Sequence, residues 1–345
     1  MSKMNVAVIG AGAIGRTHID LALRHDAVQL AAIADPTDAA RELAQTRGVR
    51  WFPDYREMLD TVRPQAAIVA TPNATHVSVG VDCMERGVPV LVEKPIADTV
   101  EEAQHLCDAA ERSGLPLLVG HHRRHNPIIR KAREIIASGR LGMPVSANVM
   151  ATWLKPDSYF DVEWRRKPGG GPILINLIHE IDLLRVLLGE IDSLQAMRSS
   201  AARGFEVEDT AAIMLRFRNG ALATITLSDA TVAPWIWDLA SGESTHYCRQ
   251  HVNSHFLCGT DASLTLPSLD IWSYRDRRGW QDPLTLERTT PHEGNPYVEQ
   301  LRHLRAVVEC KEPPVCSGID AMRTLEATLA VHASADSGKR VMLHI

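Results

Sequence analysis

The stretch Met4-Asn-Val-Ala-Val-Ile-Gly-Ala-Gly-Ala-Ile-Gly15 decides the fold of this chain. Its first half is a short apolar run, and its second half has the spacing G-x-G-x-x-G. In such a turn the first glycine permits the tight bend, the second leaves room for a pyrophosphate, and the third lets a helix pack close to the strand. The N-terminus of that helix then faces the anion. Following a strand and opening a helix, Gly10–Gly15 predicts a dinucleotide-binding turn, Ala13 and Ile14 included.

Apolar runs alternate with helical patterns through the first 120 residues. The later runs are Leu30–Ala34, Ala66–Ala70, Val88–Val92 and Leu115–Val119. The helical patterns are Gly15–Arg24, Ala39–Thr46, Tyr55–Thr61, Ala74–Arg86 and Thr99–Ser113. Runs without polar alternation are typical of strands covered on both faces. The repeated order of strand, helix and strand predicts an α/β fold with a doubly wound parallel sheet of Rossmann type over residues 1–124.

Beyond Arg124 the pattern changes, and residues 125–345 are predicted to form an α+β domain. Strand-like segments follow one another without helices between them, which favours a large, mostly antiparallel, open sheet. These segments are 145–153, 193–199, 210–216, 221–228, 262–266 and 269–274. Helices are expected at 127–138, 173–188, 297–311 and 319–336. Residues 230–256 are interpreted as an ordered loop.

Composition excludes several classes of protein. Lys plus Arg is 37 and Asp plus Glu is 42, a net charge of −5, which is not the electrostatic footprint of a nucleic-acid binder. No apolar run approaches the roughly 20 residues that span a bilayer, and the first strand begins too early for a secretory signal. The six cysteines are irregularly spaced and form no C-x-x-C pair. We therefore expect a cytoplasmic protein with neither a nucleic-acid nor a membrane partner.

The second strand ends at Asp35, twenty residues after Gly15. An acid at this place accepts hydrogen bonds from the adenosine ribose hydroxyls and repels a 2′-phosphate, so NAD is favoured over NADP. The alternative is that Asp35 serves as a helix N-cap or a turn residue.

Further motifs follow the later strands. They are Ala70-Thr-Pro-Asn-Ala-Thr-His76, Glu93-Lys94-Pro95, Gly120-His-His-Arg-Arg-His-Asn-Pro127, Gly169-Gly-Gly171 and His179-Glu-Ile-Asp182. In this order and spacing the chain, from residue 4 to its C-terminus, resembles the Gfo/Idh/MocA oxidoreductases, the family of glucose–fructose oxidoreductase and inositol dehydrogenase.

The resemblance implies an NAD-dependent dehydrogenase that acts on a secondary alcohol or ketone of a cyclitol, sugar or sugar derivative. Residues 1–124 would bind NAD, and residues 125–345 would bind the substrate and form a homodimer or homotetramer. Lys94 would lie beside the nicotinamide, and the bond into Pro95 is often cis in this family. The implied cofactor-binding residues are Gly10, Gly12, Ala13, Ile14, Gly15, Asp35, Thr71, Pro72, Asn73, His76, Glu93 and Lys94.

Hydride loss from a carbinol also requires that its hydroxyl proton leave, and Lys94 and His179 are the candidates for this chemistry. Lys94 can stabilise the developing alkoxide, and it can act as a base where burial and positive charge lower its pKa. The alternative is an ordinary loop lysine. His179 lies on a helical segment that is apolar nearly all round, with Asn176 and Glu180 on the same arc. A structural histidine is the alternative there.

One position departs from the family pattern. Many members carry an Asp four residues before the helix-borne histidine, and here that residue is Ile175. Asn176 is offset by one residue and supplies no negative charge. Either Asp182 or a distant carboxylate takes this place, or Lys94 and His179 work without one.

The predicted substrate-binding set adds Arg124, Lys155, Trp164, Arg165 and Asn176 to Lys94 and His179. For Arg124 the alternative is an ion pair between domains, and for the segment that holds Lys155 and Arg165 it is ordinary packing. Trp235 and Trp237 could serve a pocket or a subunit contact.

Two other functions compete with the sugar or cyclitol dehydrogenase. Three cations near one cleft, Arg124, Lys155 and Arg165, would suit the carboxylate of a cyclic hydroxy acid, and a dihydrodiol is the companion possibility. A non-catalytic nucleotide-binding sensor is the third hypothesis, against which the presence of both Lys94 and His179 argues. No metal is expected, because the histidines at 121, 122 and 125 lack a recognisable further ligand set.

Overall fold

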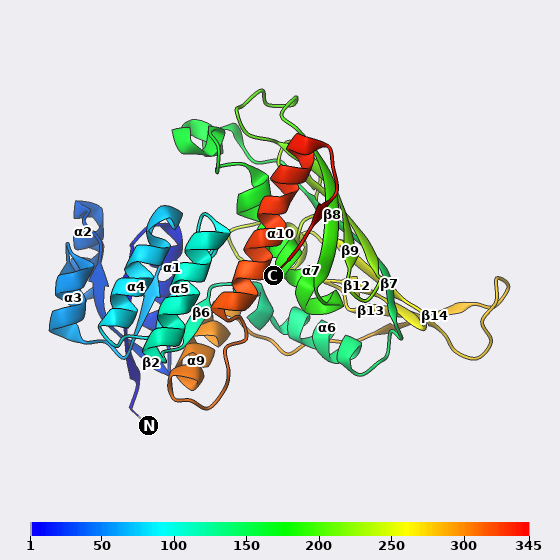
Figure 1. Ribbon diagram of the computed structural model, residues 1–345. Coiled ribbons are helices and arrows are strands. Elements are labelled where there is room, and N and C mark those ends of the chain that lie inside the picture. Colours follow the sequence, from blue (N-terminus) through cyan, green and yellow to red (C-terminus); the bar gives the residue numbers. More distant parts are fainter. Residues whose placement is uncertain (1, 345) are drawn as a thin grey trace. The chain divides into compact units, whose positions relative to one another are not determined.

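The computed structural model describes residues 2–344, which group into two compact units (Figure 1). The first unit runs through His125 and takes up Gly294–Leu325 again, and the second holds Asn126–Glu293 and the chain from Glu326 onward. The structure therefore places residues 294–325 in the first unit, whereas the sequence-based boundary put everything after residue 124 in the second domain.

The first unit contains a parallel sheet of six strands in the order β3-β2-β1-β4-β5-β6. The strands are β1 (Met4–Ile9), β2 (Val28–Ala34), β3 (Arg50–Phe52), β4 (Ala66–Val69), β5 (Val90–Val92) and β6 (Leu117–Val119). The helices between them are α1 (Ala13–Ala22), α2 (Asp38–Arg47), α3 (Tyr55–Val62), α4 (His76–Glu85) and α5 (Val100–Ser113). The predicted doubly wound sheet is confirmed, and its strand order reverses beside β1, where open α/β sheets bind ligands. The short edge strand β3 was not predicted.

Helix α9 (Pro296–Val308) explains why the chain returns to the first unit. Its apolar side chains Leu301, Leu304 and Val307 are buried in the same core cluster as residues of β1 and β2. Arg305 Nη1 also donates to the Ala27 carbonyl at 3.1 Å. An amphipathic pattern predicts a helix, but it does not say which core the apolar face will cover, and this is why the sequence-based boundary differs.

The second unit contains a sheet of nine strands in the order β14-β13-β12-β11-β7-β10-β9-β8-β15. The strands are β7 (Pro144–Thr152), β8 (Ile191–Ser199), β9 (Thr210–Phe217), β10 (Leu222–Ser228), β11 (His255–Gly259), β12 (Ala262–Leu266), β13 (Asp270–Tyr274), β14 (Leu284–Arg288) and β15 (Val341–Met342). Only the β7–β10 pair is parallel among the strand pairs of this described sheet, which confirms the mostly antiparallel prediction. Strands β11, β14 and β15 were not predicted, and the 230–256 segment contains α8 (Trp237–Ala240) and the start of β11.

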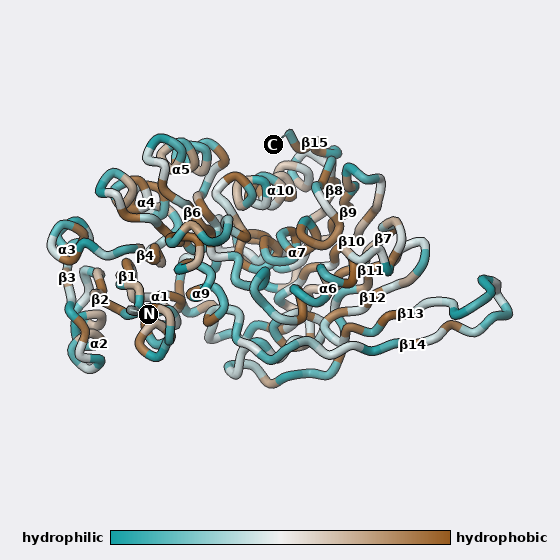
Figure 2. The backbone as a smooth tube through the Cα atoms, turned by 90° about the horizontal axis from the view of Figure 1, so that it is seen from below, coloured by the Kyte–Doolittle hydropathy of each residue, from teal (hydrophilic) through white to brown (hydrophobic). Residues whose placement is uncertain are grey.

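One face of this sheet is packed and the other is exposed. The buried face joins α6 (Pro127–Ala137) and α7 (Ile178–Leu188) in a single apolar cluster. On the opposite face Met214 and Phe256 are exposed, and cross-strand pairing places them in one row through Thr224 and Asn148. Helix α10 (Gly318–Ser337) precedes β15. The tip of the β13–β14 hairpin is hydrophilic (Figure 2).

Across residues 2–344, no helix combines the length and the apolar character that a bilayer crossing requires.

Candidate active site

The turn between β1 and α1 has the geometry that a dinucleotide requires. Gly10 has a φ of +96°, and a Cβ added to it would lie 2.6 Å from the Ala70 carbonyl carbon. A Cβ on Gly15 would lie 2.9 Å from the carbonyl carbon of Gly10. At Gly12 the same test meets no atom within 4 Å. The turn is thus closely packed at its first and third glycines and open at the second, where a pyrophosphate would approach the helix N-terminus at Ala13 and Ile14.

Asp35 connects the end of β2 to this turn. Its Oδ2 accepts a hydrogen bond from the Ala11 amide at 2.8 Å, and its Oδ1 accepts from the Thr37 amide at 2.9 Å. The N-cap of α2 is Thr37, whose side chain accepts from the Ala40 amide, so Asp35 is a turn residue and not the cap. The Thr37 hydroxyl also donates to Oδ1, at 2.5 Å, so the acceptor site that remains for a ribose hydroxyl is on Oδ2.

The motif after β4 divides into exposed and buried residues. Pro72 is exposed, and Thr71 and Asn73 are half-buried, so all three are open to a ligand. His76 is buried, and its Nδ1 lies 2.8 Å from the Pro95 carbonyl oxygen while its Nε2 lies 2.9 Å from that of Thr71. Both ring nitrogens thus face backbone carbonyls, and a cofactor contact of His76 stays a prediction.

Lys94 follows β5 and is half-buried, and its peptide bond to Pro95 is cis, as the family resemblance implied. The neighbouring Glu93 is buried, and its contact with a cofactor stays a prediction. Glu93 Oε1 accepts from His18 Nε2 at 2.7 Å, and Oε2 accepts from the Lys94 amide at 3.2 Å. Burial alone would raise the pKa of Glu93. The hydrogen bond and charge of His18, together with the charges of His122 and Lys94, outweigh burial, and the pKa lies below its ordinary value.

Sequence reasoning missed His18. Its side chain is fully buried on the face of α1 that also carries Ile19 and Ala22. A polar residue on the apolar face of a helix was the available signal, because a buried imidazole needs a partner.

His179 stands in the first turn of α7, where it is buried. The preceding segment Ile173–Leu177 is a π-helix, and Glu208 Oε1 accepts from the Ile173 amide at 2.9 Å. Gly171 makes room for this carboxylate, since a Cβ there would lie 2.6 Å from Glu208 Cδ. A carboxylate from a distant segment therefore holds the start of the helix that presents His179.

The two carboxylates that follow His179 are both buried. Glu180 Oε2 accepts from His255 Nε2 at 2.8 Å, so this acid is engaged by another imidazole. Asp182 therefore stays the local candidate for the orienting carboxylate in place of Ile175, which is half-buried.

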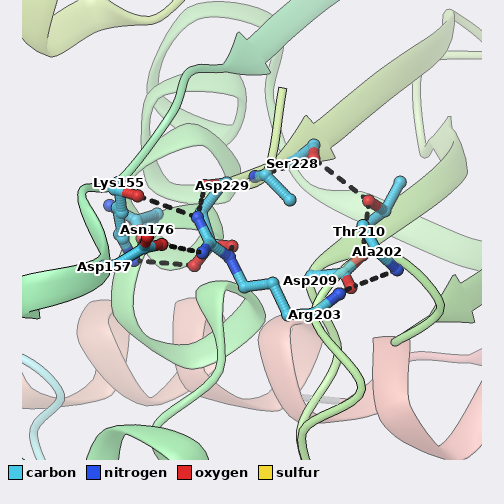
Figure 3. Close-up of polar contacts among 10 residues, drawn as sticks. Lys155, Asp157, Asn176, Ala202, Arg203, Asp209, Thr210, Ser228 and Asp229 are labelled. Carbon is cyan, nitrogen blue, oxygen red and sulfur yellow. Dashed lines mark hydrogen bonds and ion pairs between the residues drawn. The ribbon is translucent and has the colours of Figure 1, made fainter. Parts of the chain in front are cut away.

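Lys155 and Asn176, both predicted to bind substrate, bind one another (Figure 3). Lys155 is only 4 % exposed, and its Nζ donates to Asn176 Oδ1 at 2.8 Å. The same ammonium lies 3.2 Å from Asp229 Oδ2 and 4.8 Å from the centroid of the Tyr159 ring. Burial lowers the pKa of Lys155, and Asp229 opposes that shift.

Arg203 approaches the same carboxylate from the other side (Figure 3). Its Nε lies 3.2 Å from Asp229 Oδ1, and its Nη2 donates to the carbonyls of Asp229 at 2.6 Å and Lys155 at 2.9 Å. Asp209 Oδ2 fixes the turn that carries Arg203 by accepting from the Ala202 and Arg203 amides. Two cations thus share one buried carboxylate, a network that spacing along the chain did not suggest.

The other predicted substrate residues have diverse surroundings. Arg124 is buried and forms an ion pair with Asp320, and its Nη1 donates to the Val315 carbonyl at 2.9 Å. All of these residues belong to the first unit, so the pair lies within that unit and not between domains. A substrate contact of Arg124 stays a prediction. Arg165 Nη1 donates to the Tyr159 carbonyl at 2.7 Å, and Trp164 is half exposed.

Trp237 is fully buried, and its Nε1 donates to Glu243 Oε2 at 3.1 Å. This tryptophan is therefore a core residue rather than part of a pocket or a subunit contact. Trp235 is exposed.

Comparison with known sequences agrees with this geometry. Residues 4–121 match the Gfo/Idh/MocA sequence model that is described as an oxidoreductase family with an NAD-binding Rossmann fold, and residues 129–262 match the Gfo/Idh/MocA C-terminal domain. The rhizopine catabolism protein MocA of Rhizobium meliloti is 32 % identical over 190 residues, 55 % of this chain, and the chain spans 59 % of the length of that relative. The myo-inositol 2-dehydrogenase of Thermotoga maritima is 24 % identical over 99 % of this chain and 98 % of its own.

Solved structures share the fold. A levoglucosan dehydrogenase in complex with NADH and levoglucosan superimposes with a TM-score of 0.81 at 21 % identity, over the full length of both chains.

Proposed function

The chain belongs to the Gfo/Idh/MocA family of oxidoreductases, and from this premise we propose that it is an NAD-dependent dehydrogenase of a cyclitol, sugar or sugar derivative. The inositol and levoglucosan dehydrogenases among its relatives support this class of substrate. The single observation that carries the proposal is the glycine turn, open only at Gly12, in the same unit as Lys94 at the carboxyl end of β5.

NAD, when bound, accepts the hydride that leaves the carbinol carbon. The proton transfer and the stabilisation of charge are carried out by residues of this chain. Lys94 stabilises negative charge on the reacting oxygen, and His179 takes the hydroxyl proton, so that the alcohol becomes a ketone with one hydride and one proton removed. In the reverse direction His179 returns the proton. Lys155 donates to Asn176 Oδ1, which leaves the two amide N–H groups of Asn176 as the donors for a substrate hydroxyl.

The ion-pair partners of the cations disfavour a cyclic hydroxy acid as the substrate. Arg124 is paired with Asp320, and Lys155 is paired with Asp229, so two of the three cations proposed for a carboxylate already have a carboxylate partner. The sensor hypothesis is disfavoured by the half-buried Lys94, whose main chain is fixed on both sides.

Asp35 supports NAD over NADP, because a 2′-phosphate would meet its carboxylate. The nearest cation on α2, Arg41, is paired with Asp38 at 3.1 Å.

The exposed sheet face of the second unit supports a homo-oligomer, either a dimer or a tetramer. The six free cysteines support a cytoplasmic location. Met197, Met214 and Trp272 are exposed on strands β8, β9 and β13, and isolated chains rarely leave such an area uncovered. Light scattering after gel filtration tests this, and the variant Met214→Lys is expected to lower the measured mass. A monomeric wild type would contradict it.

Reduced-nicotinamide absorbance tests the activity, with NAD and NADP in parallel, across cyclitols, aldoses, anhydrosugars and cyclic hydroxy acids. Turnover of one polyol group with NAD supports the proposal. Turnover of hydroxy acids alone would favour the alternative, and NAD binding without turnover on any compound would favour the sensor.

A further inference from the structure

We infer that two buried histidines, His18 and His76, are positioning residues that hold Lys94 from its two sides. The inference rests on the proposed function only in the role of Lys94. Neither imidazole has to touch the cofactor or the substrate, because each acts through a neighbour of Lys94 in the chain.

The first contact comes from α1. His18 Nε2 donates to Glu93 Oε1 at 2.7 Å, and Glu93 Oε2 accepts from the Lys94 amide at 3.2 Å. A carboxylate only accepts hydrogen bonds, so Nε2 must carry the proton in this pair. Because α1 begins at the glycine turn, this chain of bonds connects the cofactor loop to the main chain of Lys94.

The surroundings leave Glu93 little freedom. Gly120 makes space for the carboxylate, since a Cβ there would lie 2.8 Å from Glu93 Cδ. The Tyr297 ring meets His18 edge-on at 5.8 Å and stacks on His122 at 4.3 Å, so an aromatic layer from α9 packs against the pair. Charged and titratable groups that act on Glu93 are His18, His122 and Lys94, all of which favour the carboxylate form.

The second contact comes from α4. His76 Nδ1 lies 2.8 Å from the Pro95 carbonyl oxygen, directly after Lys94, and Nε2 lies 2.9 Å from the Thr71 carbonyl oxygen. Carbonyl oxygens only accept, so the ring nitrogen that carries the proton is the donor, and the imidazole lies between the two carbonyls. His76 thereby connects the Lys94 loop to the loop after β4, the second segment expected to border the nucleotide.

The arrangement fixes the main chain of Lys94 on both sides. A lysine that must meet a reacting oxygen gains from this, because a misplacement of about 1 Å can cost about a hundredfold in rate. Since both histidines contact loops of the nucleotide-binding half, they also keep Lys94 in register with the cofactor rather than with the substrate.

The test uses Lys94 itself as the probe, so it requires no substrate. The rate at which an amine-acylating reagent modifies Lys94 is measured by peptide mass spectrometry from pH 7 to about 10, with and without NAD. The variants are His18→Leu, His76→Leu, Glu93→Gln and the conservative His18→Gln, whose amide can donate in place of Nε2. His25→Leu is the matched control, because His25 is equally buried and bonded to backbone, at Ala27 and Val298, away from the Lys94 loop.

We expect His18→Leu, His76→Leu and Glu93→Gln to change the pH profile of Lys94 modification and to weaken its dependence on NAD, while His18→Gln restores the profile. With any polyol that the wild type oxidises, kcat should fall by about a hundredfold and KM for NAD should change by less than about threefold. The control His25→Leu should have a lower melting temperature but the same pH profile of Lys94 modification as the wild type.

Profiles in all three variants identical to that of His25→Leu would overturn the inference, since the histidines would then be merely structural. Should the leucine variants fail to fold, the isosteric Glu93→Gln decides alone. A wild type without turnover would contradict the proposed function and not this inference, because the modification profile is read without substrate.

Discussion

Two regions of this molecule were assigned ligands on the same kind of reasoning, and they turned out differently. In the first unit, the Gly10–Gly15 turn has the open and closed positions that a bound dinucleotide demands. In the second unit, Lys155 and Asn176, expected to face substrate, are bonded to each other and tied to Asp229. The geometry of the first region is determined by the backbone of its glycines. The geometry of the second region is determined by hydrogen bonds and ion pairs between long side chains.

The difference shows which kinds of residue can be assigned a role from the sequence alone. A glycine constrains the backbone at its own position, so its role can be inferred from the neighbouring residues alone. A buried cation needs a counter-charge, and the partner is set by strand pairing far along the chain. Predictions about the second kind of residue therefore require the fold. Substitutions in each region separate an effect on NAD binding and turnover from an effect on stability.

The largest effect is expected for Lys94→Ala. Loss of the group that stabilises the reacting oxygen should lower turnover by about a thousandfold. NAD affinity should stay within about threefold, because the glycine turn is untouched. Steady-state kinetics and NAD fluorescence titration measure the two quantities. Lys131→Ala, on an exposed helical face beside Glu134, is the matched control with unchanged rates. Full turnover by the Lys94 variant would show that the first region only binds nucleotide.

Next in size is Asp229→Asn. The change leaves the buried Lys155 and Arg203 without their shared anion, and breaking a buried pair in this way should lower the free energy of unfolding by about 3 kcal/mol. Urea unfolding measures it. Asp157→Asn is the control, since this fully exposed carboxylate lies 3.7 Å from Arg203 and should change nothing measurable. Equal effects at both aspartates would contradict the view of the network as framework.

Gly12→Val separates binding from folding within the first region. A Cβ at Gly12 would have no atom within 4 Å, and the φ of Gly12, −67°, is ordinary for any residue. The melting temperature should therefore not change. NAD affinity should fall by at least about tenfold, because the side chain occupies the path of the pyrophosphate. Gly15→Ala, in contrast, should lower the melting temperature, because its Cβ would overlap with the Gly10 carbonyl. Normal NAD binding by Gly12→Val would place the nucleotide elsewhere.

The smallest effect concerns pH. Burial lowers the pKa of Lys155 in the folded protein, so the unfolded chain holds this proton more tightly. The stability of the wild type relative to Lys155→Met should therefore rise as the pH climbs through the folded pKa towards the ordinary lysine value. At neutral pH the substitution should cost only about 1 kcal/mol, since Asp229 keeps Arg203 as a partner. Unfolding curves of the wild type and Lys155→Met at several pH values test this. The prediction would be refuted if the free energies of unfolding of the two proteins changed in parallel with pH.

Much of the first unit could be predicted because its signals are local. The glycine turn and Asp35 lie within the first 35 residues, each apolar run is a contiguous segment, and each of these features has a meaning at its own position. What escaped prediction depends on residues distant in sequence. His18 and Glu93 meet over a separation of 75 residues, and Arg124 and Asp320 over 196. No periodicity within a helix or strand encodes such a meeting.

The second unit shows the same limit in its secondary structure. Alternation predicted β9 and β10, whose residues are buried on one face and exposed on the other. Strand β14 is exposed along its whole length, so it has no such pattern, and β11 lies at the end of a segment rich in polar and aromatic residues. The π-helix before His179 also has no signature in the apolar run Ile173–Leu177.

The return of α9 to the first unit has a consequence for biosynthesis. Leu301, Leu304 and Val307 complete a core whose other members lie mostly before residue 119. A ribosome that adds about 5–20 residues per second would need on the order of ten seconds to make the intervening second unit. During that time the nascent nucleotide-binding half exposes the apolar surface that α9 will cover, and chaperones have a defined interval in which to protect it. The same geometry means that a fragment ending at residue 125 would expose this surface permanently, whereas a fusion that joins residues 2–125 to 294–325 through a short linker would cover it.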